Sequence, residues 1–166
     1  MDDHPIMDCP NCGAHMQLDK GMDSWSCSYC RTVYYSRKNE DNVSVLNETS
    51  RFACPVCSVP LAEAAIDGHK LYYCTGCRGS LIPVETFVSL LDDLRAKQGG
   101  EWTIARPADP RELQRQIRCP QCGRQMDTHF YGGPGNIVID DCAACELNWL
   151  DKGELARIAR APEELV

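Results

Sequence analysis

The clearest hydrophobic pattern in the chain lies between residues 84 and 94. Apolar residues there follow the three- and four-residue spacing of one helix face, and they are Val84, Phe87, Val88, Leu91 and Leu94. Polar and charged residues fill the other positions, and the proline before them suits a first helical turn. The pattern predicts an amphipathic helix whose apolar face must bury against a neighbouring unit or a second copy of the chain.

A shorter helix is predicted near the C-terminal end of the sequence. Leu155, Ile158 and Ala159 give it an apolar side. Asp151 is placed to cap the first turn of this helix. The Glu154 side chain is placed to bond back to the Asp151 backbone N–H, as in a capping box.

Another short helix starts at an Asp-Pro pair and is expected to run two turns, to about Ile117. It would place Arg111, Arg115 and Arg118 on one face. The segment from 102 to 124 holds five arginines against two acids, so it is the one locally basic region of the chain. A solvated face is the simpler interpretation of these arginines, and a phosphate- or acid-binding site is the alternative.

Short strands are predicted around aromatic and β-branched residues. In the N-terminal region Trp25, Tyr29, Tyr34 and Tyr35 suit short strands, on which they would cover a metal site and stack on the sheet, an interpretation we prefer to a base-stacking surface. Residues 137–139 read Ile-Val-Ile and predict a further strand. Residues 37–51 are mostly polar with no sustained period and are interpreted as a flexible linker, with a short strand or a partner-ordered motif at the Val-Ser-Val-Leu piece, residues 43–46, as the alternative.

All twelve cysteines fall into six Cys-x-x-Cys pairs, and every other pair carries a proline after its first cysteine. The proline marks a repeat of first and second pairs, which predicts three sites of four cysteines each. The predicted metal ligands are Cys9, Cys12, Cys27 and Cys30 in the first site, Cys54, Cys57, Cys74 and Cys77 in the second, and Cys119, Cys122, Cys142 and Cys145 in the third.

The spacing between the pairs favours zinc. Within the three sites the pairs are 14, 16 and 19 residues apart, close to the spacing of four-cysteine zinc sites. One Zn²⁺ ion per site is therefore expected, with rubredoxin-like iron as the chemical rival. An interleaved pairing of the first eight cysteines is an alternative that the proline phase disfavours.

Disulfides would require an oxidising compartment, and the acidic first residues lack the apolar stretch of a signal peptide. A reducing, cytoplasmic location is expected. With four cysteines available per site, His15, His69 and His129 are expected to be strand or turn residues and not ligands.

The net charge of −7 becomes about −13 when each loaded four-cysteine site adds −2, which disfavours binding to a polyanion. No apolar run approaches the roughly 18–20 residues that span a bilayer. Units of this size cannot bury an adequate core, so metal binding is expected to supply much of the folding energy.

The predicted fold class is a small metal-stabilised protein of three tandem four-cysteine zinc ribbons, the second and third each followed by an amphipathic helix. We expect ribbon 1 over 1–36, a linker over 37–51, and ribbon 2 with its helix over 52–98. A basic connector over 99–118 leads to ribbon 3 and its helix over 119–166. The arrangement is expected to be separate beads and not one globule.

The second and third units align by their last cysteines, which places Leu81 on Trp149 and Ile82 on Leu150. The third unit reads Cys-Pro-Gln-Cys-Gly from Cys119, Ile-Asp-Asp-Cys-Ala-Ala-Cys through Cys145, and Trp-Leu-Asp-Lys-Gly-Glu-Leu from Trp149. These motifs resemble the TFIIB-like transcription-factor zinc-finger family of zinc ribbons. The resemblance is strongest over 119–155, weaker over 54–91 and limited to the cysteine pairs over 9–35. It implies four-cysteine zinc binding in a ribbon fold, and the family name suggests transcription.

The function expected from the sequence is that of a non-enzymatic protein-interaction adaptor. Four cysteines per site leave no open position for catalysis, and no catalytic motif is evident. The alternative is a nucleic-acid-binding or transcription-accessory protein that uses Arg111, Arg115 and Arg118. A zinc or thiol redox sensor is a further alternative. Self-association through the helix faces is also expected to be feasible, and no membrane contact is expected.

Overall fold

The structure is a computed structural model that describes residues 7–19, 24–35, 38–47, 49–97, 107, 109–131 and 136–161. Its strands are β1 Met7–Asp8, β2 His15–Asp19, β3 Ser24–Ser26, β4 Val33–Tyr35, β5 Ser44–Asn47, β6 Ala62–Ile66, β7 His69–Tyr73, β8 Ser80–Pro83, β9 Asp127–Phe130, β10 Val138–Cys142 and β11 Leu147–Leu150. Its helices are α1 Val84–Lys97, α2 Pro110–Gln114 and α3 Glu154–Arg160. No helix within these ranges is both long and apolar enough to cross a membrane.

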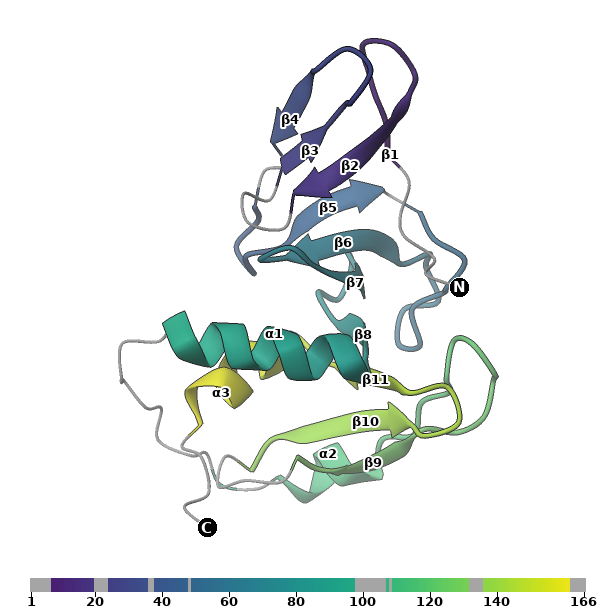
Figure 1. Ribbon diagram of the computed structural model, residues 1–166. Coiled ribbons are helices and arrows are strands. Elements are labelled where there is room, and N and C mark those ends of the chain that lie inside the picture. Colours follow the sequence, from purple (N-terminus) through teal and green to yellow (C-terminus); the bar gives the residue numbers. More distant parts are fainter. Residues whose placement is uncertain are drawn as a thin grey trace.

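Ribbon 1 forms its own antiparallel sheet in the order β1-β2-β3-β4. Its small core consists of Cys9, Met16, Trp25 and Cys27, and Leu46 of β5 packs against it. Figure 1 shows this ribbon at the purple end of the chain, beside β5. Ribbon 1 therefore rests on the second sheet through a narrow contact.

The aromatic residues of ribbon 1 divide into two groups. Trp25 is 1% exposed and packs in the core as expected. Tyr29 and Tyr34 are 82% and 43% exposed, so these two rings do not pack in the ribbon core.

Ribbons 2 and 3 share one seven-stranded sheet in the order β5-β6-β7-β8-β11-β10-β9. The two ribbons meet where β8 pairs antiparallel with β11. Leu81 lies opposite Trp149 in this pair, and these are the two residues that the repeat alignment places in equivalent positions. A local two-fold relation between the ribbons therefore passes through the Leu81–Trp149 pair.

The shared sheet buries a core on each face. The helix-side core contains the apolar face of α1 and the adjoining face of α3, with buried residues that include Phe87, Leu90, Leu91, Ile158 and Ala159. The zinc-side core contains cysteines of both ribbons around Trp149 and Leu81. Figure 1 shows α1 and α3 side by side against the sheet. Part of the helix faces that we expected to be available for self-association is thus covered within the chain, whereas Val84 and Val88 of α1 are 38% and 54% exposed.

These contacts correct the expectation of separate beads. Ribbons 2 and 3 form one globular unit because β8 of ribbon 2 and β11 of ribbon 3 pair with each other in one sheet. The expected fold class of three four-cysteine units built from short antiparallel strands is confirmed.

The segment interpreted as a flexible linker is also partly structured. Residues 44–47 form β5, which pairs with β6 at the edge of the shared sheet. The Asp41 carboxylate accepts two hydrogen bonds from Arg78, at 2.7 and 2.6 Å, and one from Tyr73 at 2.6 Å. The Arg78 hydrogen bonds hold the pKa of Asp41 below its ordinary value. This network fastens the segment to ribbon 2.

The helices begin and end close to the predicted positions, with two exceptions. α2 ends at Gln114, since Arg115 takes an extended conformation, so the helix does not reach Ile117. The residue that caps α3 is Gly153 and not Asp151, although Glu154 does accept a hydrogen bond from the Asp151 backbone N–H at 2.7 Å. Burial, with the Asp151 charge as the second cause, raises the pKa of Glu154 to about 8.

Gly79 fits against Trp149 at the junction of the two ribbons. A Cβ atom at position 79 would lie 2.8 Å from Trp149 Cη2 and closer still to Cζ2, so no side chain fits there. Trp149 is fully buried. The indole ring thus occupies the space that the missing side chain leaves.

Gly79→Ala is expected to lower the stability of ribbons 2 and 3 by about 1–3 kcal/mol, because the added methyl group overpacks the Trp149 ring. Thermal unfolding of the zinc-loaded protein measures this. The matched control is Gly76→Ala, whose Cβ would lie 3.6 Å from Cys74 Sγ in ordinary contact. In Gly79→Ala/Trp149→Leu the two losses should be less than additive, and full additivity would contradict the packing argument.

Candidate metal centres

Each Cys-x-x-Cys pair forms a tight turn that ends in a left-handed residue. Directly after the second cysteine the backbone φ is positive in all six turns, at Gly13, Arg31, Ser58, Arg78, Gly123 and Glu146. Only two of these residues are glycines, so the other four hold a conformation that L-residues seldom adopt. We call these six turns knuckles.

Backbone hydrogen bonds explain why the knuckles tolerate this conformation. In the first knuckle the Cys9 N–H donates to the Ala14 carbonyl at 2.7 Å, and the Gly13 N–H donates to the Cys9 carbonyl at 2.8 Å. The same two bonds recur in the knuckles that begin at Cys27, Cys54, Cys74 and Cys119. The loop is thereby closed on itself, with both sulfurs on one side.

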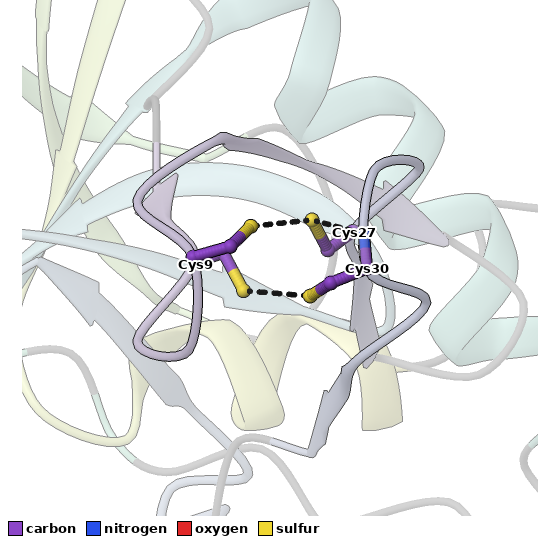
Figure 2. Close-up of side chains that lie close together, drawn as sticks. Cys9, Cys27 and Cys30 are labelled. Atoms are coloured by element: carbon purple, nitrogen blue, oxygen red, sulfur yellow. Dashed lines mark hydrogen bonds between the residues drawn. The ribbon is translucent and has the colours of Figure 1, made fainter.

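The knuckles bring the cysteines together in the predicted groups of four. Within each group all sulfurs lie within 4.8 Å of one another. Cys9 and Cys30 sulfurs are 3.5 Å apart, as are those of Cys12 and Cys27. Figure 2 shows the sulfurs of the first site directed toward one another from two facing knuckles. The grouping is sequential, so the interleaved alternative does not occur.

These distances fit a tetrahedral metal ion. Four thiolates at about 2.3 Å from a central zinc have sulfur–sulfur edges of about 3.8 Å. The Cys54–Cys77 and Cys122–Cys142 sulfurs are each 3.7 Å apart. Each group could therefore hold one metal ion, and four protein ligands leave no coordination position open for a substrate.

The ionisation of the four thiols in each group also favours a bound cation. Burial is the largest cause that raises the pKa of Cys145 to about 12, and the thiols of Cys122, Cys142 and Cys119 add to it. In the same site the backbone N–H of Arg124 lowers the pKa of Cys122 to about 7. Without metal the four thiols cannot all ionise, whereas a bound dication would stabilise all four thiolates.

The three histidines that the structure describes take no part in these sites. His15 pairs with Asp8 at 2.7 Å, and His69 and His129 pair with Asp93 and Asp141. Each of these three lies on a strand, as expected. The pKa of His129 is raised overall. Burial, the largest single cause, lowers it, but the Phe130 backbone carbonyl and the Asp141 carboxylate together raise it by more.

The three arginines of the connector do not share a face. Arg115 forms a 2.8 Å ion pair with Asp140, whose side chain is 2% exposed, and another with Asp151 at the same distance. Arg111 pairs with Asp109 at 3.1 Å, and Arg118 donates to the Gly123 carbonyl. Since α2 stops at Gln114, the helical spacing on which the prediction rested is lost after Arg111.

The sequence analysis did not identify the two carboxylates that pair with Arg115. Asp140 and Asp151 are 25 and 36 residues away. The Asp151 carboxylate also accepts a hydrogen bond from Trp149 Nε1 at 3.2 Å, which explains why it does not cap α3. The one available signal was the pair of acids, Asp140 and Asp141, that directly follows the apolar run of residues 137–139.

Arg115→Ala is expected to destabilise ribbon 3 by about 2–3 kcal/mol, because it leaves the buried Asp140 carboxylate without its cation. The loss should be smaller than for a fully buried pair, since Arg115 is 37% exposed. Arg111→Ala is the matched control and should leave the thermal midpoint unchanged, because its pair with Asp109 is exposed. Equal effects of the two changes would contradict a structural role for Arg115.

Loss of one cysteine ligand in ribbon 2 or ribbon 3 should weaken metal binding in both of these ribbons. Loss of one ligand in ribbon 1 should affect metal binding in ribbon 1 only. Cys12→Ser, Cys57→Ser and Cys122→Ser remove the equivalent exposed ligand of each site. We expect Cys12→Ser to cost one metal ion, because ribbon 1 has its own sheet and core. Either of the other two should weaken metal binding at both sites of the shared sheet, since the two sites adjoin one core.

Metal count by native mass spectrometry, with a competing chelator, measures this difference. Three independent single losses would show that the ribbons fold as separate beads after all.

Comparison with known families supports the assignment of these centres. The family model described as Transcription factor zinc-finger, a TFIIB-type zinc ribbon, matches residues 53–93 and 118–161, just over half of the chain. Comparison with curated proteins and with solved structures gave no match. The two matched segments are ribbons 2 and 3 with their helices, and the family implies zinc as the metal. The chain belongs to the transcription factor zinc-finger family.

Proposed function

We propose that this protein is a non-enzymatic adaptor that zinc holds in shape and that binds another protein. The four-cysteine geometry supports a structural and not a catalytic metal, because every coordination position is taken by the chain. The zinc ions then replace the large core that ribbons of this size lack.

The observation that carries the proposal is the aromatic surface of ribbon 1. Tyr29 is 82% exposed at a knuckle, and Val33 and Tyr34 are 47% and 43% exposed on the edge strand β4. Tyrosine is enriched at protein interfaces because its ring buries a large area while its hydroxyl keeps a hydrogen-bond partner. A rigid knuckle presents such rings at little entropic cost.

Exposed rings also suit stacking on nucleic-acid bases. The charge near the rings distinguishes nucleic-acid binding from protein binding. Arg31 is the one lysine or arginine in the described residues of ribbon 1. Binding of single-stranded nucleic acid combines stacking with a positively charged groove. The described part of ribbon 1 offers the rings with one arginine and no positively charged groove, and the acidity of the whole chain opposes a polyanion. A protein partner fits better.

Tyr29→Ser/Tyr34→Ser should abolish association with the partner and leave the metal content unchanged, because both side chains lie outside the ribbon core. The protein is isolated gently from its own cells, half is treated with nuclease, and intact masses are recorded by native mass spectrometry. We expect three zinc ions and a bound protein that survives the nuclease.

Phe130→Ser on β9 is the matched control, since that ring is 39% exposed on the far edge of the shared sheet. A complex that disappears with nuclease would favour the nucleic-acid alternative. Selective zinc loss under peroxide would favour the redox sensor.

A further inference from the structure

The first knuckles of ribbons 2 and 3 occupy equivalent positions but carry opposite chemistry. Aligned on their first cysteines, the knuckle at Cys54 is apolar where the knuckle at Cys119 is basic or polar. The paired positions are Ala53 with Arg118, Val56 with Gln121, Val59 with Arg124, and Pro60 with Gln125. Nothing in zinc binding requires this contrast, since the ligands are the same.

Only the backbones of these positions serve the metal sites. The Val56 N–H donates to Cys54 Sγ at 3.4 Å, and the Val59 carbonyl accepts from the Cys54 N–H at 2.7 Å. The Arg124 carbonyl accepts from the Cys119 N–H at 2.8 Å in the same way. The side chains are therefore available for another role.

The apolar knuckle is exposed. Val56 and Val59 are 45% and 42% exposed, and the two flanking prolines stiffen the loop between them. Adjacent apolar side chains on a rigid loop gain free energy when a partner covers them. They form the apolar half of a surface.

The basic knuckle supplies the other half. Arg118 and Arg124 are exposed, and among the described residues no carboxylate forms an ion pair with either one. Arg118 uses one N–H for the Gly123 carbonyl, at 3.1 Å, and keeps its other donors. Arginine presents these donors in a fork that matches a carboxylate.

The two knuckles are held in a fixed relation. Residues next to each of them, Phe52 and Cys54 on one side and Ile117 and Cys119 on the other, belong to the same zinc-side core. The pairing of β8 with β11 fastens the two ribbons together beneath it. A partner that spans both knuckles would therefore meet an apolar and a basic surface in a defined arrangement.

We propose that the first knuckles of ribbons 2 and 3 form one docking surface for a protein segment that carries acidic residues beside apolar ones. The carboxylates pair with Arg118 and Arg124, and the apolar side chains cover Val56 and Val59. A phosphate backbone would satisfy the arginines but leave the valines without a partner. This inference rests on the proposed adaptor function and names one surface and the chemistry of its partner.

A random peptide library displayed on phage, panned on the zinc-loaded full chain, tests this proposal. Recovered peptides should be enriched in Asp or Glu next to Leu, Ile or Phe. Their Kd should rise about tenfold or more in Val56→Ser/Val59→Ser and in Arg118→Gln/Arg124→Gln. Added salt should weaken binding to the parent but much less to the arginine variant.

Matched controls change the same residue types elsewhere. Val84→Ser/Val88→Ser on α1 and Arg31→Gln/Arg160→Gln should leave the Kd unchanged, and all variants should retain three metal ions. Recovered peptides without acidic enrichment, or with binding that ignores both knuckle variants, would overturn the proposal. If peptides bind and only Tyr29→Ser/Tyr34→Ser abolishes that binding, the adaptor function is supported and the proposed knuckle surface is rejected. If no peptide binds and single-stranded DNA or RNA does, both fail.

Discussion

Four thiols held within 4.8 Å of one another cannot all ionise unless a cation lies among them, and this constraint governs the fold. Backbone hydrogen bonds close five of the six knuckles, and four of the six have a non-glycine residue at positive φ directly after the second cysteine. Such local strain is retained only where the surroundings over-determine it. Metal binding is the term that can supply that energy, so the knuckles and the hairpins that carry them depend on the closure of the sites.

Ribbons 2 and 3 add a second source of stability that ribbon 1 lacks. Their third strands pair with each other, which removes two exposed edges and joins two small cores into a helix-side core and a zinc-side core. Ribbon 1 keeps a core of four residues and leaves two of its tyrosines in solvent. The chain thus combines a well-packed double unit with a lightly packed single one, and the exposed surfaces that we assign to partners lie on knuckles of both.

Local patterns predicted the local structure well. Cysteine spacing and the proline phase identified all three groups of four, and helical periodicity located α1 because its apolar face is long. Long-range pairing was not accessible in this way. β8 reads Ser-Leu-Ile-Pro, too short to indicate a partner, and Asp41 in a polar segment gives no sign that Arg78 will fasten it to ribbon 2. Arg111 and Arg115 look equivalent in sequence, yet only Arg115 reaches a buried acid, because that acid comes from β10.

The junction of the two ribbons is symmetric in backbone but not in side chains. Trp149 rests on Gly79, while the residues in the equivalent positions are Leu81 and Leu147. Two copies of ribbon 3 placed together would set a tryptophan against a leucine twice, and two copies of ribbon 2 would leave the glycine uncovered twice. Each ribbon is therefore shaped to accept the other and to reject itself. The two ribbons therefore correspond to the two different subunits of a heterodimer joined in one chain, and a change at Gly79 or Trp149 in one ribbon alters the surface on which the other packs.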